Sequence, residues 1–142
     1  MITNIFKRMF LFVAVSVFSF NLHAADWTMA SGYPKSNFHT QNIIKFIDDV
    51  KSNTSVNINL NPNDTLIKLD AIKTSLQRGQ IPIGEIRLGI YGNEDPMYIL
   101  AGLPFIAPDY SSAWLLKDVQ MEYLQEKFAK KGLMILYTAP WP

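Results

Sequence analysis

The sequence of 142 residues contains no cysteine, and this absence excludes three kinds of chemistry together. Disulfides, thiolate metal sites and thiol nucleophiles all need the missing side chain. The fold therefore has to be held together by its apolar core alone.

Histidine is nearly as scarce, and neither common glycine-rich phosphate-binding pattern is present. After residue 24 the only histidine is His39, and a metal site needs several ligands. We therefore expect neither a metal nor another cofactor. Ser36 lies close before His39, but no placed acid completes a catalytic triad. The sequence accordingly predicts a protein that is not an enzyme.

An excess of charge of either sign is also missing, since 13 basic residues face 12 acidic ones. Proteins that bind nucleic acid by its phosphates cluster their lysines and arginines on one face. The sequence has no such cluster, so we expect no nucleic-acid partner.

The amino terminus has the pattern of a secretory signal peptide. Lys7 and Arg8 precede an uncharged run from Met9 to Phe20, which is too short to span a bilayer as a helix. Small residues predict cleavage after Ala24, so residues 1–24 are the expected signal peptide. An uncleaved membrane anchor stays open as the alternative, because Leu22 is bulkier than the residue usual at its position. With cleavage, we expect a periplasmic protein of one modest domain, residues 25–142, that is not integral to the membrane.

Residues 25–80 predict two units of strand followed by helix. Trp27 to Ala30 is an apolar strand, and Val56, Ile58 and Leu60 alternate with asparagines as in a second strand. Helical spacing predicts a helix over about residues 37–52, with Ser36 as its N-cap, and another over about 65–78 that ends at Gly79.

Residues 81–138 are predicted to hold two further strands and the longest helix. The strands span 81–90 and 133–138, and the long helix begins at Ser111 and stops at Gly132. Three prolines restrict any helix between them to a turn or two over residues 97–101. Strands that alternate with helices indicate an α/β fold with a mostly parallel sheet flanked by helices. Ligands bind beyond the carboxyl ends of such strands.

Glu85 is the most informative charge, because it lies inside an apolar strand where an unpaired carboxylate is costly. The alternative is a surface residue paired with Arg87 on the same strand face. Glu94 and Asp95 precede Pro96 and fit a solvated turn. Four aromatic residues near strand ends or helix starts suggest a small-molecule cleft, although core packing explains each singly: Tyr33, Phe38, Tyr91 and Trp141.

Six stretches in order carry a resemblance to a known family: Met29 to Pro34, Arg78 to Ile86, Tyr91 to Pro96, Leu103 to Ala107, Ala113-Trp114, and Lys131 to Pro142. In these stretches the chain resembles the DctP-type extracytoplasmic solute-binding proteins of tripartite ATP-independent periplasmic (TRAP) transporters. None of them is diagnostic alone; their order over more than a hundred residues makes the match specific.

The resemblance implies a periplasmic-binding-protein-like lobe of a two-lobed clamshell, which closes on an organic acid and delivers it to TRAP membrane subunits. By position, Glu85 matches the acid of the first lobe that commonly lines the cleft. The loop from Ser31 to Asn37 is implied to form another wall, with Tyr91 and Asn93 nearby.

Family members are roughly twice as long as this chain, so the resemblance also implies an incomplete first lobe. The arginine that grips the ligand carboxylate lies in the part that is missing. We therefore expect residues 1–142 alone not to bind an organic acid with useful affinity and to fold marginally. Two alternatives stay open, a periplasmic ligand-sensing accessory protein and a non-functional remnant of an interrupted gene.

Overall fold

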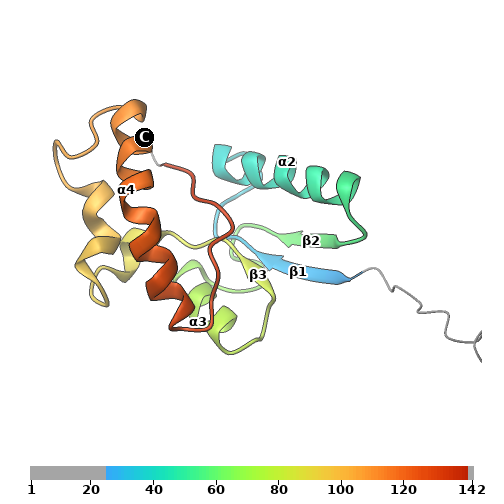
Figure 1. The fold of residues 1–142 in the computed structure, drawn as a ribbon. Coiled ribbons are helices and arrows are strands. Elements are labelled where there is room, and N and C mark those ends of the chain that lie inside the picture. Colours follow the sequence, from blue (N-terminus) through green and yellow to red (C-terminus); the bar gives the residue numbers. More distant parts are fainter. Residues whose placement is uncertain (1–24, 141–142) are drawn as a thin grey trace, which may run out of the picture.

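The computed structural model describes residues 25–140, and within them it has a three-stranded parallel sheet flanked by helices (Figure 1). The strands are β1 (Asp26–Ala30), β2 (Asn57–Asn61) and β3 (Ile83–Gly84), in the order β2-β1-β3. This confirms the predicted α/β class. The predicted signal peptide, residues 1–24, and Trp141 lie outside the described residues.

The first unit is β1, helix α2 (Phe38–Asn53) and β2. β1 pairs with β2 along its whole length, from Asp26 beside Asn57 to Ala30 beside Asn61. The predicted cap of α2 is wrong by one residue, because the Asn37 side chain and not that of Ser36 accepts from the His39 amide. One apolar cluster joins α2 to the sheet, and its buried members are Met29, Ile43, Ile58 and Ile83.

The second crossover is shorter in helix than the sequence predicts. Only a 3-10 turn η1 (Leu69–Ala71) and helix α3 (Ile72–Gln77) form within the expected helix over residues 65–78. Asn63 and Asp64 take left-handed backbone angles, and the Asp64 carboxylate accepts from the Leu69 amide. Local hydrogen bonds from polar side chains compete with helical backbone hydrogen bonds, so the turn after β2 extends and the helix starts late. Gly79 ends the helix with a φ of 66°, as predicted.

The predicted strand over residues 81–90 is reduced to Ile83–Gly84. Its partner β1 ends at Ala30, where the chain turns through Gly32, so β3 has no neighbour to continue beside. The Glu85 amide still donates to the Ala30 carbonyl oxygen at 2.9 Å. Residues 88–102 then form two 3-10 segments, η2 (Leu88–Tyr91) and η3 (Pro96–Gly102), which agrees with the limit set by the prolines.

Helix α4 (Tyr110–Ala129) lies apart from the sheet with η3 beside it (Figure 1). Asp109 caps it, accepting from the Ser112 amide at 2.7 Å. Its buried face packs into a second cluster, whose buried members are Tyr91, Tyr98, Leu124 and Phe128. We call the part built on β1, β2 and β3 the sheet half, and the part built on η2, η3 and α4 the α4 half.

Residues 133–138, predicted as a closing strand, pair with no strand among residues 25–140, so that prediction is wrong. The segment from 133 to 140 runs from the end of α4 back along the sheet half (Figure 1). Leu133 and Ile135 pack against the second cluster, that of Tyr91, Tyr98, Leu124 and Phe128, while the Met134 side chain is 80% exposed. Packed and exposed side chains therefore do alternate along the segment. Side-chain packing, and not a ladder of backbone hydrogen bonds, keeps the segment in place.

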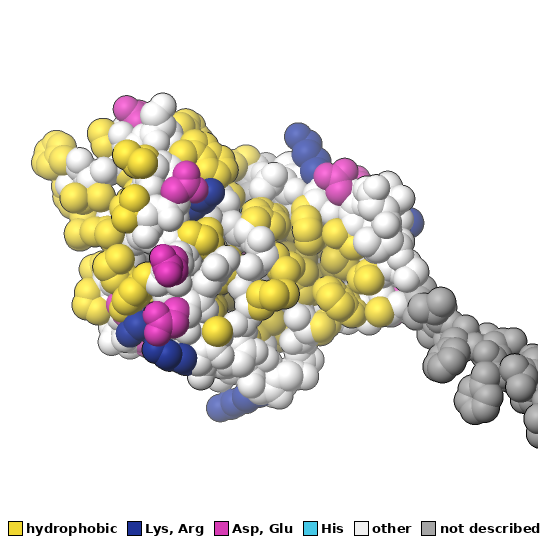
Figure 2. Space-filling model, in the orientation of Figure 1, with side chains coloured by type: hydrophobic (Ala, Val, Ile, Leu, Met, Phe, Trp, Pro, Cys, Tyr) yellow, Lys and Arg dark blue, Asp and Glu magenta, His cyan; other side chains and the backbone are white. Residues whose placement is uncertain are grey.

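The α4 half leaves many large apolar side chains on its surface, where they gather in Figure 2. The most exposed are Leu115 at 67%, Val119 at 71% and Phe105 at 94%, the last with a φ of 66°. Monomeric proteins rarely expose a contiguous apolar patch this rich. Among residues 25–140 nothing covers the Phe105 side chain.

Candidate functional site

Two strand ends of the sheet half bring a serine and a glutamate together. Ser31 follows β1 directly, and Glu85 follows β3. The Ser31 hydroxyl donates to Oε2 of Glu85 at 2.5 Å and accepts from the Tyr33 amide at 3.3 Å. Ser31 is fully buried, and its own amide donates to the Asn61 carbonyl oxygen at the end of β2. All three strands therefore contribute to the position of this pair, which lies at the carboxyl edge where ligands of parallel sheets bind.

Glu85 is half-buried, and its surroundings disfavour its charge. Burial raises the pKa of its carboxyl above the ordinary value, and the hydrogen bond from Ser31 offsets part of that rise. The structure gives Glu85 a buried hydrogen-bond partner. That partner is Ser31, which sequence reasoning did not single out because a lone serine after a strand carries no pattern.

Tyr33 lies at the same edge, in the turn that follows Ser31. Its carbonyl oxygen accepts from the Asn63 amide at 2.8 Å and from the Thr40 hydroxyl at 3.3 Å. Burial raises the pKa of its phenol, the Arg87 charge lowers it, and the Glu85 charge raises it further. The phenol is therefore within electrostatic reach of both charged side chains of the β3 end.

Tyr137, from the segment after α4, is a second residue of this edge that sequence reasoning missed. Burial raises the pKa of its phenol, and the Glu85 charge raises it further. Its ring centroid lies 5.3 Å from that of Phe46 on α2. The sequence pattern placed Tyr137 inside the expected strand over residues 133–138 and gave it no role at this edge.

Phe38 is the first residue of α2 and is 48% exposed. Its ring centroid lies 4.1 Å from that of His39, which lies 6.1 Å from that of Tyr33. His39 is buried, and burial lowers its pKa. Phe38 and Tyr33 therefore flank one histidine that packs in the turn, beside the Ser31 and Glu85 pair.

Tyr91 and Asn93 lie in the α4 half. Tyr91 is only 7% exposed, and its hydroxyl donates to the carbonyl oxygens of Leu69 at 3.3 Å and Asp70 at 3.2 Å. Burial raises the pKa of its phenol. Asn93 is exposed in the loop between η2 and η3. The structure thus brings Tyr33 and Glu85 together, whereas the buried Tyr91 side chain ties η2 to η1.

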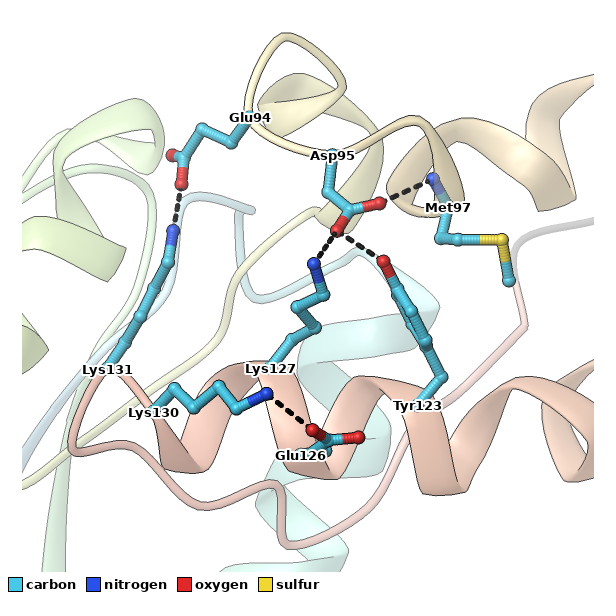
Figure 3. A network of polar contacts seen from close by, with 8 residues as sticks. All are labelled: Glu94, Asp95, Met97, Tyr123, Glu126, Lys127, Lys130 and Lys131. Carbon is cyan, nitrogen blue, oxygen red and sulfur yellow. Dashed lines mark hydrogen bonds and ion pairs between the residues drawn. The ribbon is translucent and has the colours of Figure 1, made fainter.

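A polar network joins η3 to α4 (Figure 3). Asp95 is 6% exposed and accepts from the Tyr123 hydroxyl at 2.7 Å and the Met97 amide at 3.0 Å, and Lys127 pairs with it at 3.0 Å. The hydrogen bond from Tyr123 is the main reason that the pKa of Asp95 falls to about 2. Asp95 is therefore not part of a solvated turn.

Glu94, beside it, pairs with Lys131 and with Lys73, and the hydrogen bond from Lys131 is the largest of the causes that lower its pKa. Lys73 is 2% exposed, and its ammonium lies 4.1 Å from the Tyr91 ring centroid. Sequence reasoning missed this buried lysine, because a lysine inside an amphipathic helix reads as solvent-facing. Every charge of this network has a partner, so it serves to hold η3, α3 and α4 together.

Residues 25–140 hold no group of three or more histidine, aspartate or glutamate side chains placed to bind a metal ion. None of their helices combines the length and the apolar run that crossing a membrane requires.

Comparison with protein-family models gives no match, and no curated protein matches the chain. Solved structures do match. The DctP6 extracytoplasmic solute receptor of Bordetella pertussis, which binds pyroglutamic acid, is 40% identical with a TM-score of 0.80 over 83% of this chain. DctP7 of the same organism, also a pyroglutamic acid receptor, is 33% identical with a TM-score of 0.79 over 84%.

A TRAP solute-binding protein from a marine metagenome, in complex with pyroglutamate, is 32% identical with a TM-score of 0.80 over 85% of this chain. In all three comparisons the chain spans only 40% of the length of the solved protein. The predicted resemblance is confirmed at the level of sequence and fold for that part of the receptors.

Proposed function

The chain is the counterpart, over 40% of their length, of DctP-type TRAP extracytoplasmic solute receptors, and on that premise we propose that residues 25–142 form one lobe of a periplasmic receptor for a small organic acid. The observation that carries the proposal is the Ser31 and Glu85 pair. It lies at the carboxyl edge of the parallel sheet, in a chain 40% identical to a receptor that binds pyroglutamic acid.

Pyroglutamate is the ligand that we propose first. The three solved receptors at 32–40% identity are all described with pyroglutamate or pyroglutamic acid. In this chain Glu85, Tyr33 and Phe38 would contact or border the ligand from the sheet half. Tyr91 would act by fixing the η2 segment, and Asn93 would border the site from the loop that follows it.

In this proposal the described residues supply one wall of the site. In a receptor that closes by a hinge, contacts from both lobes stabilise the closed, ligand-bound state. A chain that spans 40% of the receptor length would lack the opposing contacts, so we propose that it does not hold the ligand with useful affinity by itself. The completed receptor would pass its ligand to TRAP membrane subunits and would catalyse no reaction.

Calorimetric titration with a panel of organic acids tests both parts of the proposal. We expect no measurable heat of binding from residues 25–142 alone. We expect micromolar binding of pyroglutamate when residues 25–140 are joined to the remaining part of the 40% identical Bordetella receptor. Micromolar binding by residues 25–142 alone would contradict the one-lobe proposal, and a folded joined receptor that binds no organic acid would contradict the receptor proposal.

A further inference from the structure

Residues 133–138 have the composition of a strand but no strand beside them. Gly132 and Pro140 bound the segment, which itself contains no charge, glycine or proline. In the part of the chain that the structure describes, the segment belongs to no sheet, and no backbone hydrogen bond reaches residues 134–140. The backbone donors and acceptors of the segment are therefore available to a strand from outside residues 25–140.

Side-chain packing already fixes which face of the segment points inward. Leu133 and Ile135 pack against the second cluster, and the Tyr137 ring lies against an aromatic ring on α2. On the other face, Met134 is 80% exposed and Leu136 is 52% exposed. Natural edge strands discourage pairing with lysine or proline, and the segment has neither. It is thus held in place as an apolar strand that nothing in its own sequence protects from pairing.

A second copy of the same segment is a partner that fits by charge and by register. Two-fold antiparallel pairing keeps the packed side chains of both copies on one face, because directly opposed residues share a face. Centred on Ile135, this register places Leu133 opposite the partner's Tyr137 and Met134 opposite the partner's Leu136. Every opposed pair is apolar, and no like charges meet. The segment is therefore complementary to itself.

We propose that residues 133–137 are a dimerisation strand, which pairs in antiparallel fashion with the same residues of a second copy of this chain. The two-fold symmetry closes the contact, so it gives dimers and not growing assemblies. The contact is small, and interfaces well below about 1,600 Å² are weak. We expect a dissociation constant on the order of 10–100 µM for residues 25–142. The inference goes beyond the receptor function and does not rest on it.

Sedimentation velocity of residues 25–142, at concentrations from about 5 µM to about 500 µM, tests the proposal first. We expect the monomer to give way to a species of twice its mass. A monomer throughout, or species that grow beyond the dimer, would overturn the proposal. If the chain stays monomeric and the amides of residues 133–137 gain protection only in the joined receptor, the strand pairs with another part of the receptor and the proposal is wrong.

Two double variants at the exposed positions test the register. Met134→Lys combined with Leu136→Lys places like charges opposite each other and should weaken association at least about tenfold. Met134→Lys combined with Leu136→Glu loses the same apolar side chains but opposes unlike charges, so it should associate at least about fivefold more tightly than the double-lysine variant. Parallel pairing in register would oppose like charges in both variants. Equal weakening of the two variants would therefore overturn the proposal.

The matched control lies on helix α4, whose exposed face is the rival surface for a second copy. Leu115→Lys combined with Val119→Lys adds the same charge as the double-lysine variant, at positions that are 67% and 71% exposed. It should leave the dissociation constant within about twofold of its original value. If this control abolishes the dimer and the segment variants do not, α4 is the interface and the proposal is overturned. Circular dichroism checks that every variant keeps its fold.

Discussion

Glu85 in the sheet half and Asp95 in the α4 half are both carboxylates held by a hydroxyl, yet their pKa values move in opposite directions. Burial raises the pKa of Glu85, which accepts one side-chain hydrogen bond from Ser31. Asp95 accepts from Tyr123 and Met97 and pairs with Lys127, and its pKa falls to about 2. Among residues 25–140, Asp95 has three polar partners and Glu85 has one side-chain partner. A carboxylate whose charge its partners favour stabilises the fold, whereas one whose charge is disfavoured by burial at a strand end is the kind that we propose for a ligand site.

Helix α3 supports both regions through two consecutive residues. Ile72 is 0% exposed and faces the sheet half, where a Cβ on Gly84 would lie 2.7 Å from its Cγ2 atom. Lys73 faces the α4 half, with Glu94 and the rings of Tyr91 and Tyr98 around it. Variants of these two residues and of the two carboxylates therefore test the comparison.

The largest effect is expected from Ile72→Ala. Truncating a fully buried isoleucine should lower the free energy of unfolding by about 2–5 kcal/mol, because the transfer energy is lost and a cavity remains. Urea unfolding followed by circular dichroism measures it. Ile90→Ala, at a position 39% exposed, is the matched control and should cost less than about 1 kcal/mol. Equal losses for the two variants would mean that α3 does not anchor the sheet half.

Lys73→Ala should come next, with a loss of about 2 kcal/mol. The change removes a buried cation whose ammonium lies 4.1 Å from the Tyr91 ring centroid and 5.9 Å from that of Tyr98, although Glu94 keeps Lys131 as a partner. Lys68→Ala is the control, because its ammonium is exposed and pairs with Asp64 at 3.9 Å. An exposed pair of this kind contributes about 0–1 kcal/mol. If Lys73→Ala proves as mild as Lys68→Ala, the network does not hold the α4 half.

Acid should weaken the α4 half through Asp95. Its pKa of about 2 in the folded state lies below the value of about 3.9 in the unfolded chain. The stability that it contributes is therefore complete above the unfolded pKa and is lost as the pH falls from about 4 through about 2. Asp95→Asn should remove that part of the pH dependence, measured by thermal unfolding between pH 5 and pH 2. Asp118→Asn, an exposed change on α4, should retain it, and an unchanged slope in Asp95→Asn would contradict the assignment.

Glu85→Gln is expected to have the smallest effect on stability. The contribution of Glu85 to stability changes with pH in the opposite direction to that of Asp95. Because the pKa of Glu85 is raised in the folded state, its charge opposes folding as the pH rises through that pKa. A neutral amide of the same shape should therefore leave stability at neutral pH unchanged or higher, within about 1 kcal/mol. Thermal unfolding at pH 7 checks the sign. A clear loss would place Glu85 with Asp95 as a stabilising carboxylate and would remove the contrast between the two halves.

Much of the sheet half could be predicted from the sequence because its signals are local. Apolar spacing located β1, α2 and β2, and an acidic side chain inside an apolar run marked Glu85. Tertiary pairing set the rest. β3 ends where its neighbour β1 ends, and no spacing rule contains that information.

The misses in the site and in the α4 half have a common physical reason. Ser31 and Lys73 acquire their roles from partners 54 and 21 residues away in sequence. Apolar and polar or exposed positions alternate over residues 133–138 as in a strand. Such alternation tells which side chains share a face, but not which strand lies beside the segment. Phe105, 94% exposed, carries a bulky apolar side chain into a left-handed backbone position, and nothing in the described residues explains it.

The all-parallel order β2-β1-β3 has a consequence for how the chain folds in time. β1 is the central strand and the first to be made, yet its partners begin at Asn57 and Ile83. Every strand pairing therefore waits for the closure of a long loop, and contacts of such sequence separation slow folding. The strand that organises the sheet is also the one that spends longest without a neighbour. During synthesis it stays unpaired until the segments that hold β2 and β3 have been made.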